Sequence, residues 1–185
     1  MKNILFILSG PSGVGKGTLA NLLRERNKNV ALSISCTTRQ PREHETDGKE
    51  YFFISKDEFI KEIESDGFLE YSSHFGNYYG TPRKFVENKL KTHDVMLEID
   101  VNGGLSVKKN YKDAILIFIA PPSFNELKNR LINRHTETED KIEERLQRID
   151  YEFEKEKQYD YTVINDDLNS AVSELEKIIN EEKNK

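Results

Sequence analysis

Five short segments of mostly apolar residues recur along the chain and constrain its fold more than any other feature. They are nearly continuous apolar runs, a pattern typical of strands buried on both faces of a parallel sheet that helices cover. The sequence therefore predicts an α/β fold with a five-stranded parallel core sheet. The expected strands are Ile4 to Leu8, Ala31 to Ser35, Val95 to Ile99, Ala114 to Ile119 and Tyr161 to Asn165.

Stretches with helical character separate these strands. Three capping boxes, in which a Ser or Thr precedes a Glu by three residues, mark helix starts at Ser55, Ser123 and Thr136. The expected helices are Lys16 to Arg26, Lys56 to Glu64, Pro82 to Lys91, Asn102 to Asn110, Ser123 to Arg134, Glu139 to Gln158 and Leu168 to Glu182.

Two polar segments interrupt the predicted core. The first, about Thr37 to Thr92, is too long for a plain connection and contains strand-like pieces around a short helix, which predicts an inserted mixed α/β lobe. The second, Arg130 to Arg148, is rich in arginine and predicts a mobile helical lid. We expect one domain with a core (1–35, 93–125 and 149–185), a lobe (about 36–92) and a lid (about 126–148).

Composition excludes several classes of function. The net charge of -5 argues against general nucleic-acid binding, and no apolar run approaches the roughly 18 residues of a membrane span. The first apolar run is also too short for a signal peptide. Lone Cys36 and four scattered histidines show no metal-ligand spacing. We expect a cytoplasmic protein without structural metal and without nucleic-acid or membrane partners.

A glycine-rich turn directly after the first apolar run gives the first functional signal. Gly10, Gly15 and Lys16 have the spacing of a P-loop, in which backbone N–H groups surround phosphate oxygens and the lysine neutralises the outer phosphates. The sequence therefore predicts a site for a nucleoside triphosphate. Its expected members are Gly10, Pro11, Ser12, Gly13, Val14, Gly15, Lys16, Gly17 and Thr18.

One residue of this loop departs from the usual pattern. Gly17 stands where Ser or Thr usually offers a hydroxyl to magnesium, and Thr18 follows it. Mg²⁺ is therefore expected to be held mainly by nucleotide phosphates and water rather than by a protein metal site.

Two classes of P-loop protein, GTPases and small kinases, could carry such a loop. The Asp-x-x-Gly form of Asp100 to Gly103 is typical of a GTPase switch, but the chain lacks the Asn-Lys-x-Asp motif that reads guanine in GTPases. A small kinase is favoured. The segments SCTTRQPREHETDGKEYFF, FLEYSSHFGNYYGTP, VMLEIDVNGG and RHTETEDKIEERL occur in the order found in guanylate kinases, and the chain resembles that family from Ile4 to about Leu175.

The resemblance implies transfer of a phosphoryl group from ATP to GMP with Mg²⁺, giving ADP and GDP. It implies that the phosphate of GMP is bound by Arg39, Arg42, Tyr51 and Tyr79, and that guanine is read by Ser35, Glu70, Thr81 and Asp100. An ionised carboxylate such as that of Glu70 only accepts hydrogen bonds, so it suits the N1–H and amine of guanine and not the N1 lone pair of adenine.

The resemblance also assigns residues to the ATP side. Arg130, Arg134 and Arg145 match arginines that fold over the ATP phosphates, and Asn165 matches a residue near the adenine. Lys16, Arg39, Arg134 and Arg145 are the expected catalytic residues. Asn102, Gly104 and His135 depart from the residues usual in the family. Two alternatives stay open at this point: a kinase for another phosphorylated acceptor, and a related module that binds protein segments.

Overall fold

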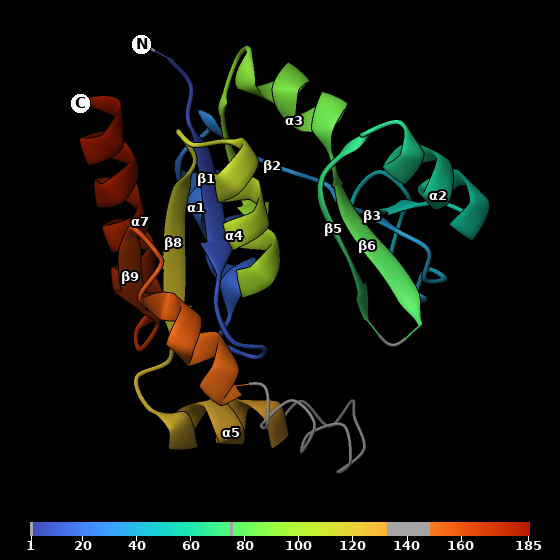
Figure 1. Cartoon of the computed structure of the whole chain (residues 1–185). Helices are drawn as coiled ribbons and strands as arrows, with labels where there is room; N and C mark the ends of the chain where they lie inside the picture. Colours follow the sequence, from blue (N-terminus) through green and yellow to red (C-terminus); the bar gives the residue numbers. More distant parts are fainter. Residues whose placement is uncertain (1, 75, 133–148) are drawn as a thin grey trace.

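A computed structural model of the chain describes residues 2–74, 76–132 and 149–185, without the side chains of residues 74 and 129–132. Its core is the expected five-stranded parallel sheet, in the order β2-β7-β1-β8-β9 (Figure 1). The strands are β1 (Leu5–Ser9), β2 (Val30–Leu32), β7 (Asp94–Glu98), β8 (Ile115–Ala120) and β9 (Tyr161–Ile164). The predicted fold class is confirmed.

Four of the predicted strands agree with the observed bounds to within one residue, whereas one ends three residues earlier than expected. The segment expected from Ala31 to Ser35 forms β2 over Val30–Leu32, and Ser33 makes a last backbone bond to Met96 O at 2.9 Å. The chain then leaves the core and enters a second sheet at Cys36. The residues after Leu32 connect the core sheet to the second sheet and belong to neither. The run of residues that predicted the strand is therefore longer than the strand itself.

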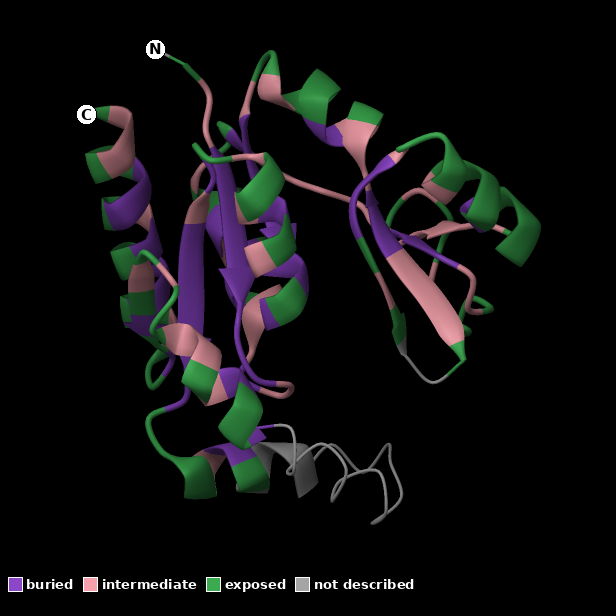
Figure 2. Cartoon of the chain, viewed as in Figure 1, coloured by how far each residue is buried: buried purple, intermediate pink, exposed green. Residues whose placement is uncertain are grey.

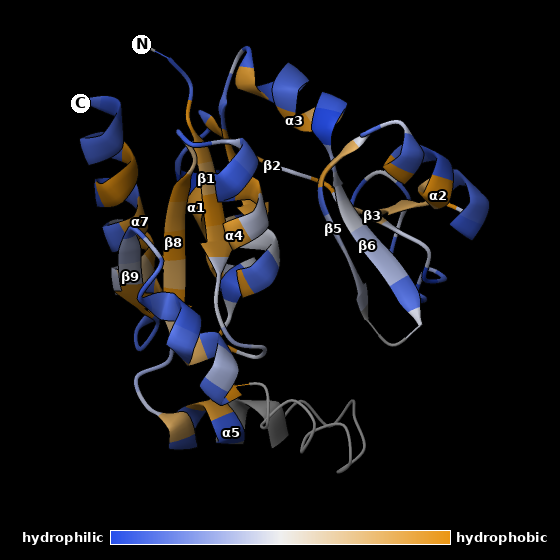
Figure 3. Ribbon diagram, viewed as in Figure 1, coloured by the Kyte–Doolittle hydropathy of each residue, from blue (hydrophilic) through white to orange (hydrophobic). Residues whose placement is uncertain are grey.

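Helices cover both faces of the core sheet, and alternate residues of β1 face opposite sides. Phe6 and Leu8 pack in a cluster with side chains of α1 (Lys16–Arg26) and α7 (Leu168–Lys183). Leu5 and Ile7 pack in a second cluster with side chains of α3 (Arg83–Leu90) and α4 (Val101–Asn110). The central strands β1, β7 and β8 are accordingly mostly buried and apolar, whereas the outer helix faces are exposed and hydrophilic (Figures 2 and 3).

Two of the three predicted capping boxes lie in the described residues, and both mark the start of a helix. At α2 (Lys56–Glu64) both bonds of the Ser55 and Glu58 box are present. Ahead of α5 (Phe124–Ile132), Ser123 Oγ accepts a bond from Glu126 N at 3.1 Å. The third box, at Thr136 and Glu139, lies outside the described residues. Residues 149–156 are helical, and no helix in the described ranges is long and apolar enough to cross a membrane.

A second, smaller sheet lies beside the core (Figure 1). Its order is β4-β3-β6-β5, with β3 and β4 parallel and the other pairs antiparallel. A buried cluster around Phe59 of α2 and Phe68 of β5 holds it together. Its strands are β3 (Cys36–Thr37), β4 (Phe52–Phe53), β5 (Phe68–His74) and β6 (Asn77–Pro82). The exact division into core, lobe and lid stays a prediction.

Candidate functional site

The glycine-rich loop joins the end of β1 to the start of α1, and two of its glycines are required by their surroundings. Gly10 has φ 143° and Gly15 has φ 96°, both unfavourable for residues with a side chain. A Cβ on Gly10 would lie 2.3 Å from Ile119 O of β8. A Cβ on Gly15 would lie 2.6 Å from the side-chain nitrogen of Asn165. The loop is therefore pressed against β8 and the end of β9.

The side chain of Lys16, the predicted cation of the loop, folds back onto the backbone of the loop. Lys16 Nζ donates to Gly10 O at 2.7 Å and to Pro11 O at 3.2 Å. Gly15 is the N-cap of α1 and supplies no side-chain bond, and no acidic residue occupies the first turn. The first N–H groups of α1 are thus not capped by a side chain, which leaves the positive end of the helix available to an anion. Thr18 is exposed in the same turn.

Asn165 has a structural contact that the sequence did not predict. Its side chain is buried, and Nδ2 donates to Val14 O in the loop at 2.8 Å. Its backbone N–H continues the pairing of β9 to Ala120 O at 2.8 Å. Asn165 therefore supports the loop from the end of β9. Its expected place near an adenine stays a prediction.

A pocket of about 160 Å³ lies between the core and the second sheet. Its lining comes from the segment after β2, from the residue before β4, from β5 and β6, and from the end of β7 and the two residues after it. Five of the eight residues predicted to bind GMP line it: Ser35, Tyr51, Glu70, Tyr79 and Asp100. The structure thus brings together residues that are as far apart in the sequence as Ser35 and Asp100.

Two carboxylates of this pocket meet at the start of α4. Asp100 is the N-cap of the helix, and its Oδ1 accepts a bond from Gly103 N at 2.8 Å. Glu70 is buried and accepts a 2.6 Å bond from Thr81 Oγ1, so Thr81 lies behind the pocket. A Cβ on Gly103 would stand 2.9 Å from Glu70 Oε2 and 3.5 Å from Asp100 Oδ1. The helix N-terminus favours both negative charges.

The side chain of Arg39 lies beside the pocket, against the ring of Tyr51. Its guanidinium carbon is 5.5 Å from the ring centroid of Tyr51, which packs edge-on to Tyr79 at 6.1 Å. The hydrogen bond to Glu45 is the main reason that the pKa of Arg39 is raised, and Tyr79 adds to it. Burial, followed by the negative charge of Glu98, raises the pKa of Tyr51. The Arg42 side chain is exposed.

Glu98 is a candidate residue that the sequence analysis missed. It ends β7 beside Leu8 of β1, lines the pocket, and its Oε2 would lie 3.2 Å from a Cβ on Gly17. The carboxylate therefore lies between the glycine-rich loop and the pocket. The available signal was its place in the sequence, because a charged residue that ends an apolar strand two residues before Asp100 lies at the same edge of the sheet.

The structure does not test every predicted residue. Arg134 and Arg145 lie outside the described residues, and of Arg130 the structure describes only its place in α5. Within the described ranges, no three His, Cys, Asp or Glu side chains form a group that could hold a metal ion.

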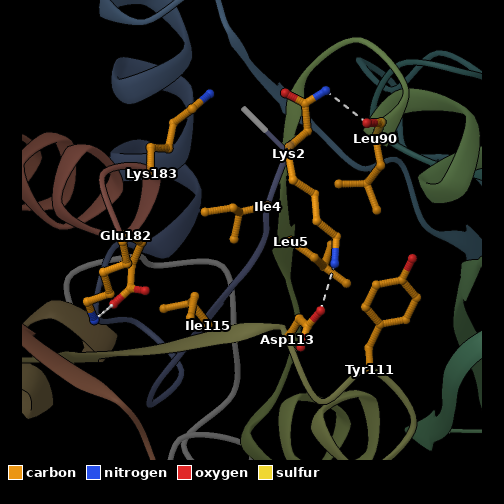
Figure 4. A pocket seen from close by; sticks show the side chains of 11 residues that line it. Lys2, Ile4, Leu5, Leu90, Tyr111, Asp113, Ile115, Glu182 and Lys183 are labelled. Atoms are coloured by element: carbon orange, nitrogen blue, oxygen red, sulfur yellow. Dashed lines mark hydrogen bonds and ion pairs between the residues drawn. The ribbon is translucent and has the colours of Figure 1, made fainter.

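A larger pocket, of about 500 Å³, lies at the opposite end of the sheet, near both chain ends (Figure 4). Apolar side chains such as Ile4, Leu90 and Ile115 line it. Its rim carries ion pairs, Lys2 with Asp113 at 2.7 Å and Lys185 with Glu182 at 2.6 Å. Because the glycine-rich loop follows the other end of β1, this pocket is remote from that loop.

Comparisons with known proteins agree with this geometry. The family model described as guanylate kinase matches residues 2–182. A guanylate kinase of Clostridium tetani is 50% identical over 183 residues, 98% of this chain and 88% of that protein. A guanylate kinase of Clostridioides difficile is 45% identical over 185 residues, 100% of this chain and 90% of that protein.

Solved structures point the same way. A crystal structure of guanylate kinase from Anaplasma phagocytophilum has a TM-score of 0.82 and 32% identity, covering 100% of this chain and 88% of that one. A shikimate kinase structure from Bacteroides thetaiotaomicron, 16% identical with a TM-score of 0.57, covers 96% of this chain and 98% of that one, and shares the fold. The chain belongs to the guanylate kinase family.

Proposed function

We propose that the chain transfers the terminal phosphoryl group of ATP to GMP, giving ADP and GDP. The observation that carries this proposal is the position of two sites at one edge of the core sheet. The glycine-rich loop follows β1, Asp100 follows β7, and these strands are neighbours with Leu8 opposite Glu98. Ligands of open α/β sheets bind at the carboxyl ends of the strands.

The acceptor side of the proposal rests on the two carboxylates. Glu70 and Asp100 present acceptors to a small pocket, which suits the N1–H and amino group of guanine. Adenine would place a lone pair against a buried acceptor, and sites built on such bonds discriminate by about 10⁴. Ser35 and Thr81 complete the proposed guanine site, and Arg39, Arg42, Tyr51 and Tyr79 the phosphate site.

The proposed chemistry needs alignment and positive charge rather than a base. A phosphate monoester has its second pKa near 6, so the acceptor oxygen is already a nucleophile at neutral pH. Lys16 and Arg39 are proposed to bring positive charge to the two phosphate groups. Arg130, Arg134 and Arg145 are proposed for the ATP phosphates, with Arg134 and Arg145 catalytic. Exclusion of water would favour transfer over hydrolysis.

Magnesium fits the donor set beside the loop. Carboxylate oxygens and water are ligands that Mg²⁺ prefers, and Glu98 offers a carboxylate next to Gly17, where the loop lacks a hydroxyl. Glu98 is therefore proposed to help hold the hydrated ion with the ATP phosphates. When bound, the ion neutralises charge on the transferring group.

The experiment that tests these roles separates the two sites. Lys16→Ala should abolish turnover, because the loop would lose its cation. Arg39→Ala should raise the KM for GMP by about tenfold or more and leave the KM for ATP unchanged. Normal turnover by Lys16→Ala, or normal GMP affinity in Arg39→Ala, would count against the proposed function.

A further inference from the structure

Arg39 is held by a carboxylate of its own loop. Its Nη1 donates to Glu45 Oε2 and its Nη2 to Glu45 Oε1, both at 2.9 Å. The two side chains are 18% and 15% exposed, so the pair is largely shielded from water. Nη1 also donates to Gln40 O at 2.8 Å. This is the bidentate geometry in which arginine and carboxylate pair best.

The pair leaves one edge of the guanidinium to other partners. A guanidinium has an end-on edge, formed by Nη1 and Nη2, and a side-on edge, formed by Nε and Nη2. Glu45 uses the end-on edge, so its bonds consume neither the Nε hydrogen nor the second hydrogen of Nη2. Tyr79 interacts with the same guanidinium, and Tyr51 lies under it at 5.5 Å.

Glu45 is itself fixed by the backbone around Arg42. Its Oε2 accepts from Arg42 N at 2.8 Å, and its own N–H donates to Arg42 O at 3.0 Å. The carboxylate thus connects both arginines of the proposed phosphate site. The hydrogen bond from Arg39 is the main cause that lowers the pKa of Glu45, so it is ionised at neutral pH.

Two roles of opposite sign are conceivable for a carboxylate here. A negative charge beside a phosphate site weakens phosphate binding by repulsion, and Glu45 would then compete with the ligand. A carboxylate that holds the far edge of the arginine instead orients the near edge, and binding becomes stronger because less freedom is lost. The end-on pairing and the second anchor at Arg42 N favour orientation.

We propose that Glu45 is a positioning residue for the acceptor phosphate: it holds Arg39 by the end-on edge and presents the side-on edge to the phosphate. The proposal rests on the proposed function, in which Arg39 binds the phosphate of GMP. Loss of the carboxylate should therefore weaken phosphate binding even though it removes a negative charge.

The test compares Glu45→Gln with Glu50→Gln. Glu50 lies in the same loop and also accepts a backbone bond, from Thr46 N at 2.8 Å, but its ion pair is with Lys49. A glutamine at position 45 can offer one oxygen, and its amide would face the guanidinium. We expect Glu45→Gln to raise the KM for GMP by about tenfold with the KM for ATP unchanged. Glu50→Gln should stay within about twofold of the parent.

A second ligand separates positioning from a general structural effect. Guanosine carries the base and no phosphate, so its inhibition constant against GMP reports the guanine site alone. Positioning predicts that Glu45→Gln weakens GMP binding and leaves the guanosine constant unchanged. Glu45→Asp, which retains the charge at a shorter reach, should fall between the parent and Glu45→Gln.

The outcomes are distinguishable. Unchanged or tighter GMP binding in Glu45→Gln, with Arg39→Ala impaired, would overturn the positioning role and leave the proposed function intact. Equal loss of guanosine and GMP affinity would also overturn it, because the effect would then be structural. A parent protein inactive with GMP would instead contradict the proposed function.

Discussion

At the scale of single residues, the amide of Asn165 shows how a contact between distant residues supports a binding loop. It reaches from the end of β9 to Val14 O and lies within contact of Gly15. A buried carbonyl without its donor costs about 1–3 kcal/mol. The geometry of the glycine-rich loop therefore depends on a residue 151 positions away in the sequence.

Asn165→Ala should accordingly weaken ATP binding through the loop. We expect the KM for ATP to rise by about tenfold, because one buried hydrogen bond is lost, and the KM for GMP to stay unchanged. Steady-state kinetics with each substrate varied in turn measures both. Asn169→Ala, in the exposed first turn of α7, is the matched control. An unchanged KM for ATP would show that the loop does not need this bond.

Cys36 gives a prediction for pH dependence. It is buried in β3, and desolvation raises its pKa to about 12. The thiolate is the reactive form, and an unfolded cysteine ionises near pH 8.5. The thiolate fraction at pH 8 is therefore lower by a factor on the order of 10³ in the folded chain, and the folded thiol should label more slowly by that factor than the thiol of the chain unfolded in guanidinium.

The raised pKa of Cys36 also makes the stability of the fold depend on pH. The folded state disfavours the thiolate, so the contribution of Cys36 is fully present below the unfolded pKa and is lost as the pH rises above about 8.5. Cys36→Ser should reduce this alkaline loss. Equal labelling rates for folded and unfolded chains would contradict the burial of the thiol.

At the scale of elements, the N-terminus of α4 shapes the pocket that Glu70 and Asp100 line. Asp100 caps it, and the absence of a side chain at Gly103 lets Glu70 approach to the distances given above. A strand of the second sheet and a helix of the core thus contribute one carboxylate each. The two carboxylates can lie close together only because Gly103, in the first turn of α4, has no side chain.

Gly103→Ala should therefore disturb guanine binding in particular. Its Cβ would stand 2.9 Å from Glu70 Oε2, so the carboxylate must move. We expect a KM for GMP about tenfold higher and a KM for ATP unchanged, although alanine favours the helix itself. Ser106→Ala, exposed on the same helix, is the control. Unimpaired GMP binding in Gly103→Ala would show that Glu70 does not need its present position.

The elements that the sequence predicted best were those with local signals. The apolar runs identified all five core strands, and the Ser55 and Glu58 box identified the start of α2. The end of β2 was mispredicted, because where a strand leaves its sheet depends on its partners and not on its own residues. The contacts of Asn165, Glu98 and Glu45 were missed for a related reason, since each depends on how separate segments pack.

At the scale of the whole molecule, each of the two sheets carries different residues of the proposed reaction site. The core sheet carries the glycine-rich loop, and the second sheet carries Glu70, Tyr79 and the segment around Arg39. The two chain ends lie at the opposite end of the core sheet (Figure 1). At that end, Lys183 of α7 forms an ion pair with buried Asp94 at 2.7 Å. This ion pair and the proposed substrate sites thus lie at opposite ends of the core sheet.

Phosphorylation of GMP at this site is best tested with a panel of nucleoside monophosphates. ADP formation from ATP and Mg²⁺ would be measured with GMP, AMP, CMP and UMP offered separately to the folded protein. We expect rapid turnover with GMP and turnover lower by about 10⁴ with AMP. Comparable turnover with AMP, or no turnover with GMP, would contradict the proposed function.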